Sequence, residues 1–300
     1  MELLQLKYFQ VVARNEHIAR SAEQLNVSQP AISLMISRLE QELGTKLFDR
    51  MGRRIVLNEF GSAFLNYVDK MLREEENARL KIQEMKSGAI QSISVALTSP
   101  YLLDGIILPF ISVHPDVRWK IRVADIAQCV NLMKSGMVDF CVSAPGIWNN
   151  RVLTTTCIED EVVVAVSRKH PFAGRESLSL EEIATERMIS LVGDYAFRRF
   201  VDDVFGGYGI RLNYHIECNH LLRNRLLEAN QGISISLRSA KHRNLYDDKV
   251  CLIPIKQENF PKIQITVCRM EDRYLTDIAS ALIGDIVQFY KADGLCDLGH

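Results

Sequence analysis

Apolar residues recur at helical spacing from the start of the chain. Leu6, Phe9 and Ala13 share one face of a helix predicted over residues 1–14. A second, shorter helix is expected from Ile18 to Leu25, and a tight turn at residues 26–27 ends it. The apolar face of the first helix is therefore expected to cover the elements that follow it.

A third helix is predicted to begin at Ser28. The Ser28 hydroxyl can accept a hydrogen bond from an unpaired backbone amide, and Pro30 lies in the first turn, where a missing N–H costs nothing. The apolar face of this helix carries Ile32, Ile36, Leu39 and Leu43, and another face carries the polar residues Gln29, Ser33 and Ser37. A tight helical hairpin of this kind is typical of a helix-turn-helix that enters the major groove of DNA. The alternative is a small helical hairpin that binds nothing.

A small β-hairpin, or wing, is predicted after the third helix. Gly44 can end that helix in a left-handed conformation. Short apolar segments on either side of Gly52 are then expected to pair as two strands. This hairpin would place Arg50, Arg53 and Arg54 beside DNA phosphates.

Five short runs in this region match a known pattern. They are Ala22–Leu25, Ser28–Ser33, Leu39–Gly44, Leu47–Arg50 and Leu57–Gly61. Together they resemble the winged helix-turn-helix of LysR-type transcriptional regulators. The sequence departs from that family at Leu34, where a polar or basic residue often reaches DNA, and at Asn58, where threonine usually caps the next helix. The candidate DNA-binding residues are Ser28, Gln29, Pro30, Ser33, Leu34, Ser37, Arg50, Arg53 and Arg54.

A long uninterrupted helix is predicted from Asn58 to about Lys86, a rod of roughly 40 Å. Residues spaced four and three apart form a heptad seam with one polar break: Phe64, Val68, Met71, Glu75, Ala78, Ile82 and Met85. We predict that this seam pairs with the same helix of a second chain. The alternative is a helix folded back on its own domain. A homodimer would favour a double-stranded DNA site of approximate two-fold symmetry.

Beyond residue 90 short apolar strands alternate with helices. Strands are expected at 93–97, 117–123, 138–142, 162–167, 188–191, 213–218, 233–237 and 263–269, with a final helix at 274–290. This order predicts parallel sheets with helices on their faces. The two sets of strands resemble the two-lobed effector domain of the same family, a relative of periplasmic binding proteins. By that resemblance the chain would return to the first lobe near residue 263.

The predicted fold class is α/β, and the chain divides into three parts. They are a winged helix-turn-helix at residues 1–58, a linker and dimerisation helix at 59–88, and a two-lobed effector domain at 89–300. The family resemblance further implies a homotetramer formed by pairing of effector domains.

Composition and charge narrow the function. Hydrophobic residues make up 47% and charged residues 24% of the chain, as in an ordinary globular protein. The net charge is −1, so the basic signal for DNA is local: eight basic against six acidic residues up to Asn58. No apolar run approaches a membrane span, and the N-terminus starts an amphipathic helix rather than a signal peptide. A cytoplasmic protein without membrane contact is expected.

Cysteine and histidine spacing gives no sign of a metal site or cofactor. The seven cysteines form no C-x-x-C pair, and several lie in apolar strands, which favours buried structural thiols over redox sensing. The seven histidines are scattered, and no nucleophile motif, phosphate loop or dinucleotide turn is present. We therefore expect a transcriptional regulator without enzymatic activity. The alternatives are a solute-binding protein that is not exported and a small-molecule enzyme with a helical N-terminal appendage.

A small-molecule effector is expected between the two lobes, because ligands bind at the carboxyl ends of strands in sheets of this kind. The candidate effector-binding residues are Thr98, Ser99, Pro100, Asp125, Ala127, Pro145, Ser190, Val192 and Arg238. Hydroxyl groups, helix starts and Arg238 favour a small organic acid. Inward carboxylates at Asp125 and Asp194 would instead favour an amine or an amino acid.

Overall fold

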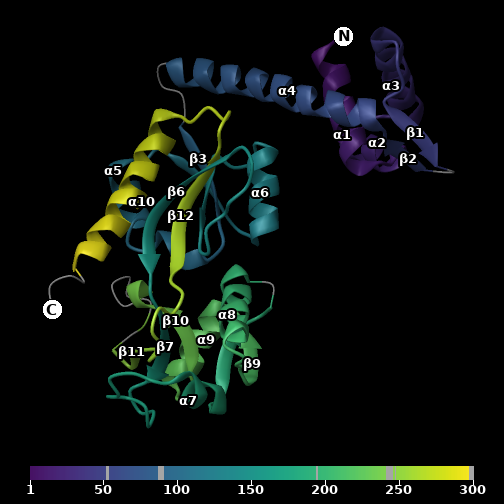
Figure 1. Ribbon diagram of the computed structural model, residues 1–300. Helices are drawn as coiled ribbons and strands as arrows, with labels where there is room; N and C mark the ends of the chain where they lie inside the picture. Colours follow the sequence, from purple (N-terminus) through teal and green to yellow (C-terminus); the bar gives the residue numbers. More distant parts are fainter. Residues whose placement is uncertain (52–53, 87–90, 194, 241–245, 247, 297–300) are drawn as a thin grey trace. The chain divides into compact units, whose positions relative to one another are not determined.

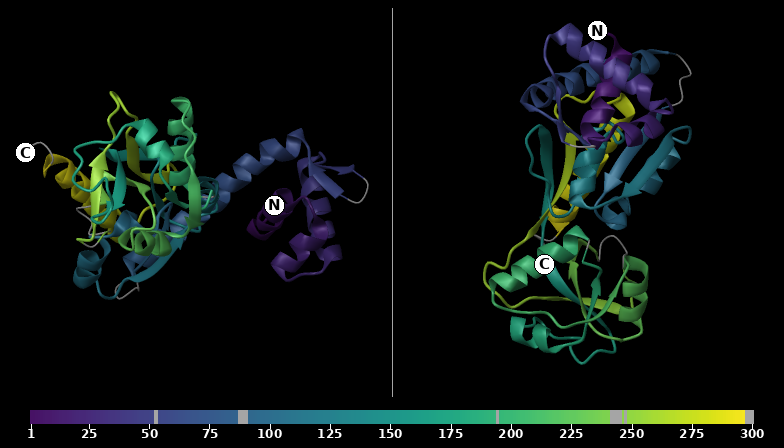
Figure 2. Two further views of the ribbon diagram at one scale, coloured as in Figure 1. Left: turned by 90° about the horizontal axis from the view of Figure 1, so that it is seen from below. Right: turned by 90° about the vertical axis from the view of Figure 1, so that its right-hand side faces the viewer.

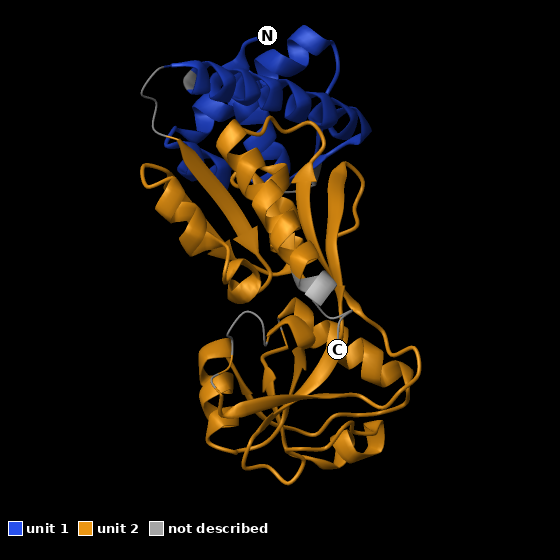
Figure 3. Cartoon of the chain, turned by 90° about the vertical axis from the view of Figure 1, so that its left-hand side faces the viewer, with its two compact units in different colours: residues 1–87 blue, residues 88–300 orange. Residues whose placement is uncertain are grey.

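The computed structural model describes residues 1–51, 54–86, 91–193, 195–240, 246 and 248–296. The chain forms two compact units, residues 1–87 and residues 88–300 (Figure 3). The boundary between the units falls close to the end of the predicted linker helix. Within the described ranges, no helix is long and apolar enough to cross a membrane.

Unit 1 contains the predicted helices and wing (Figure 1). Its elements are α1 (Leu3–Asn15), α2 (Ile18–Leu25), α3 (Gln29–Leu43), β1 (Phe48–Met51), β2 (Arg54–Leu57) and α4 (Glu59–Met85). Ser28 caps α3 by accepting a hydrogen bond from the Ala31 amide at 3.4 Å, and Gly44 ends it with a φ of 71°. The Asn58 side chain caps α4, since it accepts a hydrogen bond from the Gly61 amide at 2.9 Å. The two strands of the wing pair antiparallel.

The elements of unit 1 pack around one apolar core. Phe9 of α1, Leu39 of α3 and Leu47 before the wing are each almost fully buried. The predicted packing face of α3 is confirmed except at its last position, where Leu43 is 38% exposed. Glu40 is buried at this end of the helix instead, and its carboxylate accepts a hydrogen bond from the Leu47 amide at 2.9 Å. The core therefore continues into the wing rather than along α3.

The first half of α4 belongs to the core of its own unit. Val68 is fully buried and Leu72 is 9% exposed, and α4 packs against α1. The predicted interchain seam is therefore wrong at Val68, because α1 of the same chain covers this face of α4. Farther along the helix, Ile82 is 56% exposed and Met85 is 70% exposed. Only the later part of the predicted seam remains available to a second chain.

The first lobe of unit 2 is built on a five-stranded mixed sheet. Its strand order is β4 (Arg118–Val123), β3 (Ser92–Leu97), β5 (Phe140–Ser143), β12 (Ile263–Met270) and β6 (Val152–Asp160). The first three strands are parallel, as predicted, whereas β12 is antiparallel to both β5 and β6. Strand β6 was not predicted, because exposed and buried residues alternate along it without a continuous apolar run. The return of the chain to this lobe near residue 263 is confirmed.

Four helical segments accompany the first-lobe sheet. They are η1 (Pro100–Leu103), α5 (Ile107–Val113), α6 (Ile126–Lys134) and α10 (Asp277–Cys296). Helix α10 contacts β3 and β6, and its buried face includes Leu282, Ile286 and Tyr290. The Tyr290 hydroxyl donates a hydrogen bond to the Leu102 carbonyl at 2.8 Å, which ties η1 to the core of the lobe.

The second lobe contains two smaller sheets. Strands β10 (Ser234–Leu237), β7 (Val162–Ser167) and β11 (Val250–Pro254) form an antiparallel sheet, and β8 (Met188–Leu191) pairs parallel with β9 (Tyr214–Cys218). The helical segments are α7 (Leu180–Thr185), α8 (Ala196–Gly207), α9 (His220–Glu228) and η2 (Arg238–Ala240). The antiparallel sheet and strand β11 were not predicted. Its partners β7 and β10 are nearly continuous buried runs, a pattern that does not reveal strand direction.

Two chain segments connect the lobes, one between β6 and β7 and the other between β11 and β12 (Figures 1 and 2). Each lobe has its own apolar core. Phe197, Phe200 and Leu237 pack against both cores. These three side chains mark the place where the lobes meet, and the pocket described below lies there.

Candidate functional site

The N-terminal half of α3 presents an exposed polar face. Gln29, Pro30 and Ser33 are exposed, Leu34 is 52% exposed, and Ser37 is half-buried. The opposite face holds the buried core residues of this helix, so the exposed side chains have a rigid base. This is the face on which the sequence placed the DNA-binding residues. Ser28 itself is occupied as the cap of the helix.

The wing lies directly before α4, and hydrogen bonds from Asn58, the cap of α4, hold the start of the wing in place. The Asn58 amide donates a hydrogen bond to the Leu47 carbonyl at 3.1 Å, and the Asn58 side-chain amide donates one to the Lys46 carbonyl at 3.0 Å. On the strands, Met51 pairs with Arg54 and Arg50 pairs with Ile55. The side chains of Arg50 and Arg54, and Arg53 as a whole, lie outside the described residues, so their contacts with phosphates stay a prediction.

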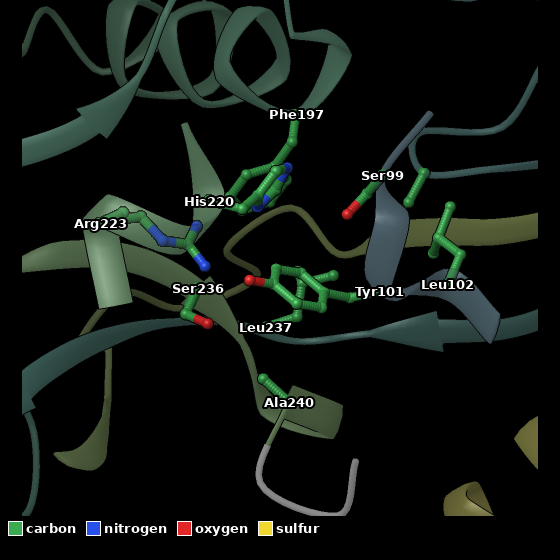
Figure 4. A pocket seen from close by; sticks show the side chains of 10 residues that line it. Ser99, Tyr101, Leu102, Phe197, His220, Arg223, Ser236, Leu237 and Ala240 are labelled. Carbon is green, nitrogen blue, oxygen red and sulfur yellow. The ribbon is translucent and has the colours of Figure 1, made fainter. Parts of the chain in front are cut away.

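A pocket of about 50 Å³ lies between the two lobes of unit 2 (Figure 4). The first lobe contributes residues after β3 and β5, and the second lobe contributes residues of α8, α9, β10 and η2. The lining residues are Ser99, Tyr101, Leu102, Ala144, Phe197, His220, Arg223, Ser236, Leu237 and Ala240. Phe197 and Leu237 are two of the three residues that pack against both lobe cores. The pocket is thus continuous with the interlobe contact.

Arg223 is the charged group of this pocket. The residue is 4% exposed, and its guanidinium donates hydrogen bonds to Asn224 Oδ1 at 3.2 and 3.3 Å and to the Tyr246 hydroxyl at 3.2 Å. The Tyr246 hydroxyl lies 2.9 Å from Ser236 Oγ. Every one of these partners is neutral. Among the described residues, no carboxylate forms an ion pair with Arg223.

His220 lies next to Arg223 on the first turn of α9. Both ring nitrogens are buried, and neither has a hydrogen-bond partner among the described residues. The rings of Tyr101 and Tyr195 stand edge-on to the imidazole, each with a centroid separation of 5.0 Å. Burial, and secondarily the charge of Arg223, lowers the pKa of His220 to about 3. The imidazole is therefore neutral at physiological pH.

Tyr101 makes a polar contact that crosses between the lobes at the pocket. Its hydroxyl accepts a hydrogen bond from the Asn224 side-chain amide at 3.4 Å, and its ring packs against His220. Burial raises the pKa of the Tyr101 hydroxyl. In Figure 4 this hydroxyl points toward Arg223 and Ser236. The first lobe thus reaches the polar centre of the second lobe through one tyrosine.

The predicted residues of the first lobe divide into one pocket residue and several that lie apart. Ser99 lines the pocket, and Pro100 begins η1 beside it. The Thr98 hydroxyl is occupied, since it accepts a hydrogen bond from the Ala144 amide at 2.9 Å and donates one to the Ala144 carbonyl at 3.4 Å. Pro145 follows Ala144 after a cis peptide bond and is half-buried.

Asp125 and Ala127 lie at the start of α6, outside the residues that line the pocket. The Asp125 carboxylate accepts a hydrogen bond from the Gln128 amide at 2.8 Å and so caps α6. One amide at the start of α6, which the sequence assigned to an anionic ligand, is therefore occupied by this carboxylate. Asp194, the other predicted inward carboxylate, lies outside the described residues.

The predicted residues of the second lobe also divide. Ser190 is half-buried and lines a small neighbouring cavity together with Phe197 and Arg223. Val192 is 43% exposed. Arg238 is absent from the lining and instead forms an ion pair with Glu161 at 2.7 Å, where the chain crosses between the lobes. The arginine that lines the pocket is Arg223.

Sequence reasoning missed Tyr101, Phe197, His220, Arg223 and Ser236. They are spread over η1, α8, α9 and β10, and all but Tyr101 belong to the second lobe. The sequence offered one unused signal, because Asn219, a helix cap, places His220 and Arg223 on the first turns of α9. An arginine and a histidine three residues apart in a helix share one face.

Four cysteines are packed as core residues of the first lobe, as the sequence predicted for several of them. Cys129, Cys141 and Cys268 are fully buried in one cluster of the first lobe, and Cys157 is 6% exposed. Burial raises the pKa of Cys157 to about 11, and the pKa of Cys141 is raised by its contact with Cys129 and by burial. The thiols of Cys141 and Cys157 therefore remain protonated near neutral pH.

Two protein families match the chain, one for each unit. Residues 3–62 match the bacterial regulatory helix-turn-helix protein of the lysR family, and residues 87–289 match the LysR substrate binding domain. The chain belongs to the LysR family. It is accordingly a DNA-binding transcriptional regulator whose activity is modulated by a small-molecule effector.

Curated relatives cover most or all of the chain. The uncharacterized HTH-type transcriptional regulator YybE of Bacillus subtilis (strain 168) is 35% identical over 97% of this chain and 100% of its own length. The RuBisCO operon transcriptional regulator of Allochromatium vinosum is 27% identical over 87% of both chains. These relatives are regulators of transcription.

Solved structures of full-length LysR proteins share the fold. A full-length OxyR variant from Pseudomonas aeruginosa aligns over 97% of this chain and 95% of its own with 21% identity and a TM-score of 0.65. Full-length BenM aligns over 98% of each chain with 21% identity and a TM-score of 0.57. CbnR in complex with its target DNA aligns over 97% of this chain and 100% of its own, with 21% identity and a TM-score of 0.54. The arrangement of elements is thus common to the family.

Proposed function

We propose that the exposed face of α3 reads the DNA sequence and that the interlobe pocket binds the effector. The observation that carries the second part is the pocket itself, which joins residues of both lobes around a buried arginine. A ligand there would contact both lobes at once and so favour one arrangement of the lobes over others. Regulation rather than catalysis is the function proposed, and the cytoplasm, where the DNA lies, is its proposed location.

On the DNA side, Gln29 and Ser33 are assigned to base edges in the major groove. Their exposure on the first turns of α3 supports this role, since the N-terminal residues of a recognition helix contact bases. Leu34 is assigned to a thymine methyl group, because an apolar side chain cannot donate a hydrogen bond to guanine. Arg50, Arg53 and Arg54 are assigned to phosphates. Ser28, Pro30 and Ser37 are assigned to supporting contacts around this face.

Binding to specific and random duplexes separates base contacts from phosphate contacts. Gln29→Ala should weaken binding to the specific site by about 1–3 kcal/mol and leave random DNA nearly unaffected. Gln41→Ala, an exposed residue in the last turn of the same helix, is the matched control. Leu34→Arg should change the sequence preferred in a selection from random DNA. An unchanged preference would place Leu34 away from the groove.

We further propose that the chain acts as a homodimer, and as a homotetramer by pairing of effector domains. The exposure of Ile82 and Met85 on the second half of α4 supports the dimer. Two α3 helices at a fixed separation would then read an approximately two-fold symmetric site.

The effector role of the pocket is tested by filling it. Ser99→Phe adds a ring to the pocket from the half-buried residue before η1, and Ser112→Phe adds one to the exposed surface of α5 as the control. Footprinting on the DNA next to the gene, with and without a metabolite library, measures the response. Ser99→Phe should keep basal DNA binding and lose every metabolite-dependent change. A response that persists in Ser99→Phe would assign the effector to another site.

A further inference from the structure

The interlobe pocket carries one uncompensated positive charge. The guanidinium of Arg223 is buried, its partners Asn224 and Tyr246 are neutral, and no described carboxylate lines the pocket. Its Nη1 atom has no hydrogen-bond acceptor in the described part of the chain. A buried charge without a counter-charge is costly, and an anion that enters the pocket would remove that cost. Arg223 therefore selects for an anionic ligand.

The single positive charge of Arg223 sets the charge of that anion. Among the described lining residues, Arg223 is the only charged side chain, because His220 is neutral and the other polar groups are hydroxyls. One guanidinium matches one carboxylate, which it can hold through two parallel hydrogen bonds. A phosphate or a dicarboxylate would leave a second negative charge buried and unpaired. A primary amine would add a second positive charge.

His220 supplies a second recognition group beside the arginine. Both of its ring nitrogens are buried and without a partner among the described residues. A neutral imidazole has one N–H donor and one acceptor nitrogen, and a buried polar atom left unpaired costs free energy. A hydroxyl next to the carboxylate of the ligand could donate to the acceptor nitrogen. His220 and Arg223 lie three residues apart on one helix face, so both can reach adjacent groups of one ligand.

Most of the remaining lining is apolar. Leu102, Phe197 and Leu237 line the pocket together with two alanines, and these side chains leave a small cavity. The pocket thus combines one cationic end with an apolar body.

We propose that this pocket binds a small monocarboxylic acid with an apolar body, in which Arg223 holds the carboxylate and His220 holds an adjacent hydroxyl. The proposal rests on the proposed effector role of the pocket. It names the ligand class and the two residues that define it. Tyr101, which contacts Asn224 and His220 from the first lobe, would close over the bound acid.

Binding to the full-length protein is measured by isothermal titration calorimetry and thermal shift. The probes are straight-chain acids of two to eight carbons and their phenyl-terminated counterparts, each with its 2-hydroxy derivative, its amide and its amine. The acids should bind, and the best of them should bind about 10- to 100-fold more tightly than its amide or amine, because a charged hydrogen-bonded pair is lost in both. Failure of every acid to bind more tightly than its own amide overturns the proposal.

Variants on one helix assign the two contacts. Arg223→Gln should weaken binding of the acid by about 10- to 100-fold. Arg225 is an exposed arginine two residues further along α9, and Arg225→Gln should leave the affinity for the acid unchanged. Arg223→Lys keeps the positive charge and should therefore bind the acid more tightly than Arg223→Gln does. This variant provides the comparison if Arg223→Gln folds poorly. His220→Phe should keep acid binding and lose the preference for the 2-hydroxy derivative. Equal acid affinity in Arg223→Gln and wild type overturns the assignment.

The outcome also separates this inference from the effector role. Acid binding that depends on Arg223 but leaves the DNA footprint unchanged would support the ligand class and refute the effector role. A neutral or cationic metabolite that changes the footprint and is blocked by Ser99→Phe would support the effector role and refute the ligand class.

Discussion

Gly61 is the position at which the wing and α4 meet, and replacing it with alanine tests the packing of unit 1. A Cβ atom on Gly61 would lie 2.1 Å from the Leu47 carbonyl oxygen and 2.6 Å from Leu57 Cδ1. Real Cβ contacts stay beyond 3.0 Å, so the Leu47 backbone must move by about 0.9 Å. That carbonyl also accepts the Asn58 amide hydrogen bond, and Leu47 is 1% exposed. The substitution therefore disturbs the start of the wing as well as α4.

The size of the effect follows from three contributions. Overpacking a well-filled core costs about 1–3 kcal/mol. Loss of the hydrogen bond between Asn58 and Leu47 adds about 1 kcal/mol. Alanine is a better helix former than glycine by roughly 0.5–1 kcal/mol, which offsets part of the loss. The net expectation for Gly61→Ala is a destabilisation of unit 1 by about 2–3 kcal/mol, or a melting temperature lower by roughly 10–20 °C for a unit of this size.

Hydrogen exchange of the full-length protein measures this effect, because peptides from α3 and α10 report separately on the two units. Protection should fall in α3 and the wing and stay unchanged in α10, and specific DNA binding should weaken. Two controls bracket the result. Ser62→Ala changes an exposed neighbour on the same turn, and Gly284→Ala adds a methyl group where nothing lies within 4 Å. If Gly61→Ala keeps wild-type protection and DNA affinity, the close contact between α4 and the wing is not present in solution.

Three further predictions concern the linker helix, the pocket histidine and the first lobe. Ile82→Glu should split the dimer without unfolding unit 1, whereas Val68→Ala should lower the stability of unit 1 by about 2 kcal/mol and leave the dimer intact. Sedimentation measures the oligomeric state, and thermal unfolding measures the stability. If Ile82→Glu still forms a dimer, the interface lies elsewhere. The pKa of His220 is about 3 in the folded protein and 6.5 for the free group. Burial of the neutral imidazole therefore contributes stability that is complete above pH 6.5 and is lost as the pH falls toward 3. The loss is at most about 1.4 kcal/mol per pH unit. His220→Phe should remove that part of the acid sensitivity and the exposed His215→Phe should not; identical pH profiles for His220→Phe and wild type would contradict the burial. Thr98→Val should cost about 1–3 kcal/mol in chemical denaturation, since it leaves a buried backbone amide without its acceptor, and a neutral effect would show that water replaces the hydroxyl.

The sequence by itself determined the local elements of this protein. Ser28, Gly44 and Asn58 act on backbone groups within a few residues of themselves, so the ends of α3 and the start of α4 could be predicted from chain order alone. The apolar spacing of α1 and α3 likewise specified which faces pack. The parallel direction of β3, β4 and β5 followed from the alternation of strands and helices.

Only the tertiary structure decided which partner each apolar face receives. The heptad pattern of α4 is the same whether its partner is α1 of the same chain or a second chain, and the burial of Val68 shows that α1 covers the first half. Strand β6 was also missed, because only two of its nine residues are buried and its place in the sheet depends on β12, more than a hundred residues away.

The pocket shows the same division. Its place between the lobes and its residue Ser99 could be inferred from the ends of predicted strands. Arg238 and Arg223 are equally plausible from sequence, but Glu161 at the crossing between the lobes pairs with Arg238, whereas α9 buries Arg223 among neutral partners. Which arginine lines the pocket depends on contacts between segments far apart in the chain. The free-energy cost of a buried charge without a partner is defined only once those segments meet.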